Sequence, residues 1–208
     1  MAAKGRIAAM ALVTATLSGC LYQQLPPPET VTLAPVPGEP LPFKARVMIY
    51  AGEQDLTRTL VIQANRTQTD ETPVKDGLLM TKAAKTLLSK GFAQVEINNP
   101  AIRPQIVVKL YGKTTWAKLD RDLKIGCAID AWTADGIPLG NFGARYIAEQ
   151  TDYHDEVEAA YGQCLKKPVE DLLNSPALAR LAGAGFKDPT PTAAEAWMRT
   201  LGPIPQMR

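Results

Sequence analysis

Two neighbouring runs of alternating apolar and polar residues constrain the fold of this chain more than any other feature. Apolar side chains recur at alternate positions in residues 105–116, apart from positions 112 and 114, and again from 123 to 131 within residues 121–133. A period of two places these side chains on one face of a β-strand. Because only a short turn near residues 118–120 separates the runs, we expect an antiparallel hairpin with one apolar face. That face comprises Ile106, Val108, Leu110, Trp116, Leu123, Ile125, Cys127, Ile129 and Ala131.

Four more segments have the composition of β-strands, and two have helical patterns. The strands are expected at residues 43–50, 60–64, 92–97 and 144–150. Residues 65–75 are expected to form a polar loop. The order of the elements predicts an α+β fold: an antiparallel or mixed β-sheet with two helices packed on one face and the other face open to water.

The two helices are predicted from their apolar stripes and their ends. Residues 76–90 begin at Asp76, a plausible N-cap, and stop before Gly91. Residues 155–174 carry a second apolar stripe that includes Cys164. Proline removes a backbone donor and clashes with the preceding turn, so we expect Pro168 to kink or divide this second helix.

The amino terminus has the features of a bacterial lipoprotein signal. Lys4 and Arg6 precede an apolar run over residues 7–17, which is too short to span a bilayer. The run ends in Leu17-Ser18-Gly19-Cys20, which resembles the lipobox, whose cysteine receives a diacylglyceryl group and becomes the new amino terminus. We therefore expect removal of residues 1–19 and lipidation of Cys20. The alternative is an ordinary signal peptide that happens to contain a cysteine.

The residues after Cys20 predict where the chain resides. Leu21 stands where inner-membrane lipoproteins carry a retaining aspartate, which implies a lipid anchor in the outer membrane facing the periplasm. Residues 20–42 are rich in proline, which favours an extended stalk of about 3.1 Å per residue. Residues 43–186 then form the α+β domain. Residues 187–208 form a Pro-rich tail, expected to be poorly ordered or partner-dependent.

Charge excludes one class of partner. The chain has 23 Lys and Arg and 21 Asp and Glu, and residues 1–19 hold two of the cations and none of the anions. The processed chain is therefore neutral overall. A nucleic-acid-binding protein has a clustered excess of positive charge, so we expect no nucleic-acid partner.

The two cysteines other than Cys20 are candidates for a disulfide. Cys127 lies on the apolar face of its predicted strand, and Cys164 lies on the apolar stripe of the helix expected to cover that sheet. An even pair in an oxidising compartment favours a bond. The alternative is two buried free thiols, which pack well in protein cores.

No residue stands out as catalytic, and no metal or cofactor is expected. The single histidine, His154, lies at the expected start of the second helix among carboxylates that favour the helix dipole. The processed chain has two serines, Ser89 and Ser175, both at expected helix ends. One histidine and two internal cysteines lack the spacing of a zinc site. A carboxylate pair for glycoside hydrolysis stays open, because distances in space are invisible in a sequence.

Three aromatic residues are candidates for partner contact. Parity places Tyr111 and Trp132 away from the apolar face of their strands, where aromatic side chains often act as interface hot spots. Alternatively, Trp132 lies flat on the sheet without contacting a partner. Trp197, in a short helical segment over residues 193–199, could dock on another protein or on its own domain.

Several segments together resemble a known family. They are the lipobox at 17–20, the Pro-rich residues 30–42 leading into Val47-Met48-Ile49-Tyr50, the helix at 78–91 followed by Phe92, and residues 104–110 and 169–178. The order resembles the YajG-type family of bacterial lipoproteins, and more loosely the lipopolysaccharide-assembly lipoprotein and the auxiliary lipoproteins of ABC-type envelope transporters. The Pro-rich tail, the two internal cysteines and the proline in the second helix depart from it. The resemblance implies envelope maintenance or assembly, not a reaction.

These observations predict a non-catalytic, lipid-anchored periplasmic lipoprotein that binds or scaffolds a cell-envelope component, with an envelope protein as the expected partner. A lipid or lipopolysaccharide carrier is the first alternative, and it requires an apolar cavity of several hundred Å³ between sheet and helices. An envelope hydrolase is the second, and it requires two carboxylates facing each other in a cleft.

Overall fold

The computed structural model describes residues 43–63, 71–117, 119–120, 122–149 and 154–205. The predicted signal sequence, Cys20 and the predicted stalk lie outside the described residues. The side chain of His154 does too. Among the described residues, no helix combines the length and apolar character that crossing a membrane requires.

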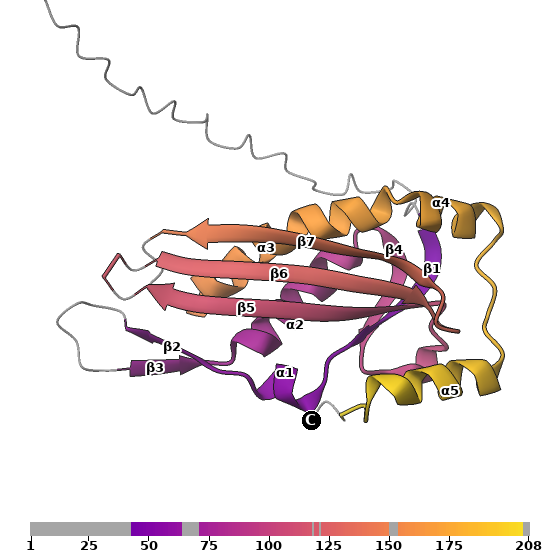
Figure 1. The fold of residues 1–208 in the computed structure, drawn as a ribbon, viewed down its shortest axis with the longest axis horizontal. Coiled ribbons are helices and arrows are strands. Elements are labelled where there is room, and N and C mark those ends of the chain that lie inside the picture. Colours follow the sequence, from indigo (N-terminus) through magenta and orange to yellow (C-terminus); the bar gives the residue numbers. More distant parts are fainter. Residues whose placement is uncertain (1–42, 64–70, 118, 121, 150–153, 206–208) are drawn as a thin grey trace, which may run out of the picture. The chain divides into compact units, whose positions relative to one another are not determined.

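Five strands form a mixed sheet in the order β4-β1-β5-β6-β7 (Figure 1). β1 runs parallel to both β4 and β5, and β5, β6 and β7 form an antiparallel meander. A second, two-stranded antiparallel sheet joins β2 and β3. The strands are β1 (Phe43–Tyr50), β2 (Leu60–Gln63), β3 (Glu71–Val74), β4 (Phe92–Ile97), β5 (Ile106–Ala117), β6 (Asp122–Thr133) and β7 (Pro138–Ala148). The fold is therefore α+β with a mixed sheet.

Helices connect and cover the strands. The α-helices are α1 (Glu53–Thr57), α2 (Asp76–Leu88), α3 (His154–Leu173), α4 (Pro176–Gly183) and α5 (Pro191–Leu201). A 3₁₀ turn, η1 (Pro100–Ile102), lies between β4 and β5. Asn98, at φ 50°, ends β4, and its side-chain amide donates to the carbonyl of Ala51 at 2.8 Å, which ties this loop to the end of β1.

Two elements differ from the sequence prediction. Residues 71–74 form β3, where a polar loop was expected, because β2 offers a pairing partner that pattern alone does not reveal. β7 begins at Pro138 instead of residue 144. Its first half contains Gly140 and Gly143, which weaken the strand signal, but pairing with β6 holds it in the sheet.

The main core lies on one face of the five-stranded sheet. Buried side chains of α2 and α3 form one apolar cluster with the apolar face of the strands. The strand contributions follow the predicted alternation. Representative buried members are Val47, Ile49, Ile106, Val108, Ile125, Ile129, Leu79, Leu88, Val157, Leu165 and Leu172. We call this side of the sheet the helix face.

The expected interruption of the second helix is wrong in one respect. α3 continues without division through Pro168, which is buried. Leu165, Val169 and Leu172 on either side of the proline are buried against the sheet. Their packing offsets the lost backbone hydrogen bond, so the helix stays one element.

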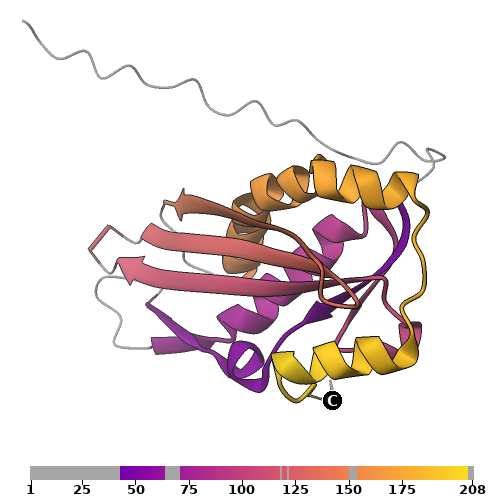
Figure 2. The same ribbon diagram turned by 45° about the vertical axis from the view of Figure 1, so that its right-hand side comes forward.

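The carboxyl-terminal tail also differs from its expectation. Instead of being poorly ordered, it forms α5, which packs on the face of the sheet opposite the helix face, beside Met48, Tyr50 and Val107. In both views α5 lies apart from α3 and α4 (Figures 1 and 2). This second face, expected to be open to water, is therefore partly covered. The sequence predicted a short helical segment over residues 193–199, and of its two predicted docking options the structure shows contact with its own domain.

Trp197 holds α5 in place. Its ring lies 5.5 Å from the ring of Trp132, and the hydroxyl of Tyr50 donates to the carbonyl of Leu201 at 2.7 Å. Gly136 has φ 92°, and a Cβ there would lie 2.3 Å from Trp197. Glycine is thus required at this turn both for its backbone conformation and for the close approach of the indole.

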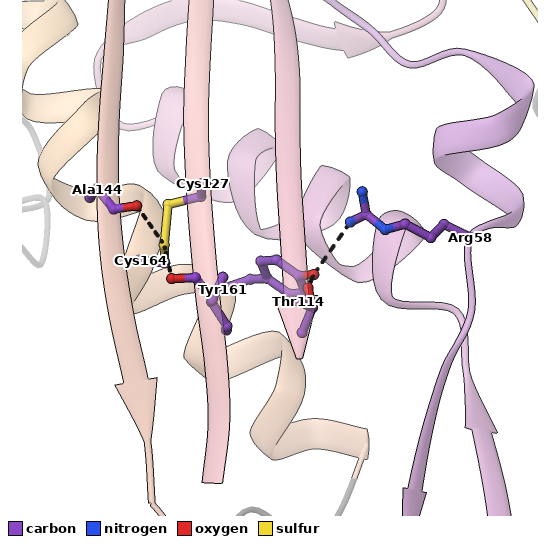
Figure 3. Close-up of a disulfide and its surroundings, with 7 residues drawn as sticks. Arg58, Thr114, Cys127, Ala144, Tyr161 and Cys164 are labelled. Atoms are coloured by element: carbon purple, nitrogen blue, oxygen red, sulfur yellow. Dashed lines mark hydrogen bonds between the residues drawn. A yellow bond between two sulfur atoms is a disulfide. The ribbon is translucent and has the colours of Figure 1, made fainter. Parts of the chain in front are cut away.

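A disulfide joins β6 to α3, which confirms the predicted pairing of Cys127 with Cys164. Their Cα atoms are 6.2 Å apart, and 37 positions separate them in sequence. Figure 3 shows the bond between the central strand of the meander and the helix that packs on it. The bond therefore fixes α3 to the helix face.

Removal of the disulfide should lower stability. For a loop of this length, we expect the Cys127→Ala/Cys164→Ala variant to lose about 3–4 kcal/mol of unfolding free energy, because the unfolded chain regains loop entropy. Urea denaturation followed by circular dichroism measures the change. Reductant should destabilise the parent protein by a similar amount and leave the double variant unchanged. Equal stability of parent and variant without reductant would contradict the prediction.

Truncation of Trp197 should release α5. We expect Trp197→Ala to reduce the docking free energy by about 2 kcal/mol, below the usual cost of a core tryptophan because the ring stays partly exposed. Limited proteolysis between α4 and α5 should then accelerate at least tenfold. Arg199→Ala, on the exposed side of the same helix, is the matched control and should cleave at the parental rate.

Candidate functional site

The structure separates the three aromatic residues predicted from sequence. Trp132 and Trp197 pack against each other, so both lie in the contact that holds α5. Tyr111 lies on the same face of the sheet but is 44% exposed. The Nζ atom of Lys109 lies 5.2 Å from the centroid of its ring. Tyr111 is therefore the one of the three that remains available to a partner, and its neighbours define the candidate site.

Nine residues around Tyr111 form a regular array on the face opposite the helix face. The pairing of β5 with β6 and of β6 with β7 aligns them in three rows of three. We call this array the outer grid. Its rows are Tyr111-Ala128-Gly143, Lys113-Gly126-Arg145 and Thr115-Lys124-Ile147.

The outer grid is hollow at its centre. A concavity of about 510 Å³ opens over β5, β6 and β7. Gly126, Ala128 and Gly143 form its floor, and Lys113 and Arg145 stand on either side of Gly126 in register. Because the floor has almost no side chains, the long side chains at its rim surround a shared space.

The charges of the outer grid are all positive. Lys113, Lys124 and Arg145 are exposed, and among the described residues no ion pair joins them to a carboxylate. Ile147, beside Lys124, is 55% exposed. Asp55 also lines the concavity, next to Arg58. The whole chain has a net charge of only +2, whereas the nine residues of the outer grid include three cations and no carboxylate. An exposed aromatic and an exposed aliphatic side chain lie beside these cations.

A buried polar network adjoins the concavity at the free edge of β5. The carboxylate of Asp76 is almost fully buried and accepts from Nε of Arg58 at 3.1 Å on each oxygen. Arg58 Nη1 donates to the carbonyl of Gly112 at 2.8 Å. Beyond Lys109, the edge of β5 that faces away from β6 has no β1 partner, and the guanidinium satisfies a carbonyl in this part of the strand.

Tyr161 completes this network from α3. Its hydroxyl donates to Asp76 Oδ2 at 2.7 Å, accepts from Nη2 of Arg58 at 3.3 Å, and is hydrogen-bonded to the hydroxyl of Thr114. Figure 3 shows Tyr161, Thr114 and Arg58 pointing toward one another. Burial raises the pKa of the Tyr161 phenol well above its usual value, and the charge of Asp76 raises it further. The phenol therefore stays protonated as a donor.

The role of Asp76 corrects a prediction. The N-cap of α2 is Lys75, and Asp76 is the first residue of the helix. Its carboxylate binds Arg58 and Tyr161, because a buried charge gains more from a guanidinium and a phenol than from a capping bond. Sequence alone gave no sign of this network, because its members come from four elements far apart in the chain.

The hydrogen bonds of this network pair a buried carboxylate with donors that stabilise its charge. The buried carboxylate faces a guanidinium and a phenol, not a second carboxylate, so it does not form the pair that a glycoside hydrolase uses. Within the described part of the chain, no group of three or more His, Cys, Asp and Glu side chains could hold a metal ion. A second concavity of about 420 Å³ lies on the outside of α2 and α3, and Ala83, Leu87, Glu158 and Gly162 are among its lining residues.

Comparisons with known proteins give the fold context. No family model and no curated protein matches the chain. Protein XCC0632 from Xanthomonas campestris, a DUF330 family protein, is similar over 69% of this chain and 90% of its own, at 10% identity and a TM-score of 0.44. PelC dodecamers from Paraburkholderia phytofirmans, in two crystal forms, are similar at 13% identity. They cover 61% and 60% of this chain and 89% and 87% of their own, with TM-scores of 0.39 and 0.38.

The Tyr161 network should show in the pH dependence of stability. The folded protein keeps the phenolic proton to a higher pH than the unfolded chain, in which tyrosine titrates near pH 10. Stability from this group is complete below about pH 10 and falls above it, by up to about 1.4 kcal/mol per pH unit. We expect Tyr161→Phe to cost about 1–2 kcal/mol near neutrality and to flatten the alkaline decline.

Urea denaturation over an alkaline pH series measures both effects. Tyr146→Phe, which removes a hydroxyl elsewhere in the same core, is the matched control and should keep the parental slope. An alkaline slope that Tyr161→Phe leaves unchanged would show that the buried phenol does not control it.

Proposed function

We propose that this chain is a non-catalytic, lipid-anchored periplasmic lipoprotein that binds a cell-envelope component through the outer grid. The observation that carries the proposal is the grid itself, a solvent-open sheet face with three cations that have no carboxylate partner among the described residues. Exposed Tyr111 and Ile147 supply aromatic and apolar contacts beside these charges. Such a combination of charged, aromatic and apolar groups suits recognition better than chemistry.

Two features support the proposed location. Leu17-Ser18-Gly19-Cys20 has the residues of a lipobox, and Leu21 favours the outer membrane in the same sequence argument. The Cys127–Cys164 bond is typical of an oxidising compartment such as the periplasm. The proposal includes a lipid on Cys20 that anchors the chain in the outer membrane. It also includes a Pro-rich stalk that separates the domain from the lipid.

The two alternative functions, an acyl-chain carrier and an envelope hydrolase, require different structural features. A carrier of acyl chains needs an apolar cavity between sheet and helices, but both concavities described above lie on outer surfaces. An envelope hydrolase needs paired carboxylates, but Asp76 binds Arg58 and Tyr161. Recognition of a lipid or lipopolysaccharide headgroup is a second candidate function, because the cations of the outer grid are complementary to an anionic group. A protein component remains the expectation from sequence.

Crosslinking in cells should identify the component. A photoreactive amino acid in place of Tyr111 should capture one defined envelope molecule, because this side chain is the exposed aromatic group of the grid. The same residue in place of Lys82, exposed on α2, is the matched control and should capture none of it. Mass spectrometry identifies the product.

The anchor is tested in the same cells. Cys20→Ala should abolish palmitate labelling, release the chain from the membrane fraction and reduce the Tyr111 crosslink. Retention of the label would disprove lipidation at Cys20. Capture of the same product from both positions would show that the outer grid is not the binding face.

A further inference from the structure

We infer that the component bound by the outer grid is a phosphomonoester on a membrane lipid headgroup, held over Gly126 by Lys113, Lys124 and Arg145. This inference rests on the proposed function and deepens it by naming the chemistry of the ligand. It differs from the acyl carrier weighed above, because the sheet face binds the headgroup and the acyl chains stay in the bilayer.

The spacing of the cations fits one small anion. Lys113 and Arg145 lie opposite Gly126 on its two sides, and adjacent strands are about 4.8 Å apart, so their backbones are about 10 Å from each other. Lys124 lies two residues along β6 on the same face, about 7 Å from Gly126. Lysine and arginine side chains span these distances, so all three can reach an oxyanion above Gly126.

The charge count favours a phosphomonoester. A phosphomonoester carries about −1.5 to −2 at neutral pH, whereas a carboxylate or a phosphodiester carries one negative charge. Lys113, Lys124 and Arg145 together supply three positive charges with no carboxylate partner among the described residues. A doubly charged oxyanion with three free oxygens balances such a set more fully than a single charge, because each oxygen can accept from a different cation.

Among the described residues, no carboxylate near the outer grid forms an ion pair with its three cations. Asp55 lies at the Arg58 end of the concavity, and its Oδ2 accepts from the backbone N–H of Gly52 at 3.2 Å. Asp130 lies one row beyond Tyr111, where it accepts from the side-chain amide of Asn141. Both groups are thus at the Tyr111 side of the outer grid. At the opposite side, Asp122 lies two residues from Lys124 on the same face of β6. Lys113 and Arg145, which flank Gly126, are therefore the cations farther from this carboxylate.

The floor of the site leaves room for the ligand. A Cβ at Gly126 would have its nearest contact with the Lys113 carbonyl at 3.9 Å, and one at Gly143 would have its nearest at 3.5 Å. Neither glycine is therefore required by close packing. Their lack of side chains leaves space above the sheet, and this space is the centre of the concavity.

The side chains around the three cations favour a lipid headgroup over a soluble phosphate as the ligand. The concavity is open, and exposed Tyr111 and Ile147 stand at opposite corners of the grid. Aromatic and aliphatic side chains next to lysine and arginine are typical of surfaces that lie on the interface of a bilayer. The lipid anchor proposed above would keep the domain beside such a surface.

Vesicle binding tests the inference. The probe is the processed chain, residues 20–208, with Cys20→Ala so that no acyl group contributes. It is mixed with phosphatidylcholine vesicles that contain an equal share of phosphatidic acid, a phosphomonoester, or of phosphatidylglycerol, a phosphodiester. Co-sedimentation should show clear preference for phosphatidic acid. Lys113→Ala/Arg145→Ala should weaken this binding about thirtyfold, since each removed cation contributes about five- to sixfold.

A steric variant separates a built site from general charge attraction. Gly126→Leu keeps every charge and fills the space between Lys113 and Arg145, so it should abolish the preference for phosphatidic acid. Lys82→Ala/Arg180→Ala, which removes two exposed cations from α2 and α4, is the matched control and should bind like the parent. Circular dichroism confirms that each variant is folded. Unchanged binding by folded Gly126→Leu, or equal binding to both lipids, would overturn the inference.

The remaining outcomes show whether the bound anion is a lipid headgroup or a soluble phosphate. They also show whether this inference alone or the proposed function is wrong. Inorganic phosphate that binds at the grid while phosphatidic acid vesicles do not would assign the site to a soluble phosphate and overturn the lipid. A Tyr111 crosslink to a protein, without vesicle binding, would retain the proposed function and reject this inference. Loss of palmitate labelling from the parent chain would reject the proposed anchor while leaving the vesicle result to stand by itself.

Discussion

The buried carboxylate of Asp76 is the interaction on which the arrangement of the helix face depends. A charge with so little access to water is stable only beside an opposite charge and hydrogen-bond donors. Arg58 and Tyr161 provide them, so the segment before β2, the start of α2 and the middle of α3 must meet at one point. The same guanidinium binds the carbonyl of Gly112 and thereby finishes the edge of β5 where β1 ends.

The alternation of the strands determines how the two faces of the sheet differ. On the helix face, buried apolar side chains line β6 and most of β5, Thr114 of β5 joins the Tyr161 network, and the disulfide attaches α3 to this face. On the opposite face, the buried apolar residues lie where α5 docks, beside Val107 and Trp132. Further along the same strands the outer grid begins, with glycine and alanine at its floor, three cations, and Tyr111 and Ile147 exposed. α5 therefore covers the apolar half of this face and leaves the basic half exposed.

Much of this fold could be predicted from the sequence because period-two patterns and helix ends are local signals. β1, β4, the hairpin of β5 and β6, and the pairing of Cys127 with Cys164 followed from such signals. β3 and the first half of β7 could not be predicted, because pairing partners determine them. The continuity of α3 through Pro168 and the docking of α5 depend on tertiary packing. The outer grid was only partly visible: Tyr111 was identified, whereas its basic neighbours acquire meaning from strand register.

The register of β1 against β5 has a geometric consequence for the lipid anchor proposed above. Phe43 opens β1, and Val47 pairs with Ile106, so Lys113 lies eleven residues further along the strand direction. At about 3.3 Å per residue, some 35 Å separates the point of attachment from the centre of the grid. The 22 residues between Cys20 and Phe43 can extend over about 70 Å. The length of these residues thus exceeds the distance from Phe43 to the grid. An anchor at Cys20, as proposed, would be compatible with contact between the grid and the membrane surface.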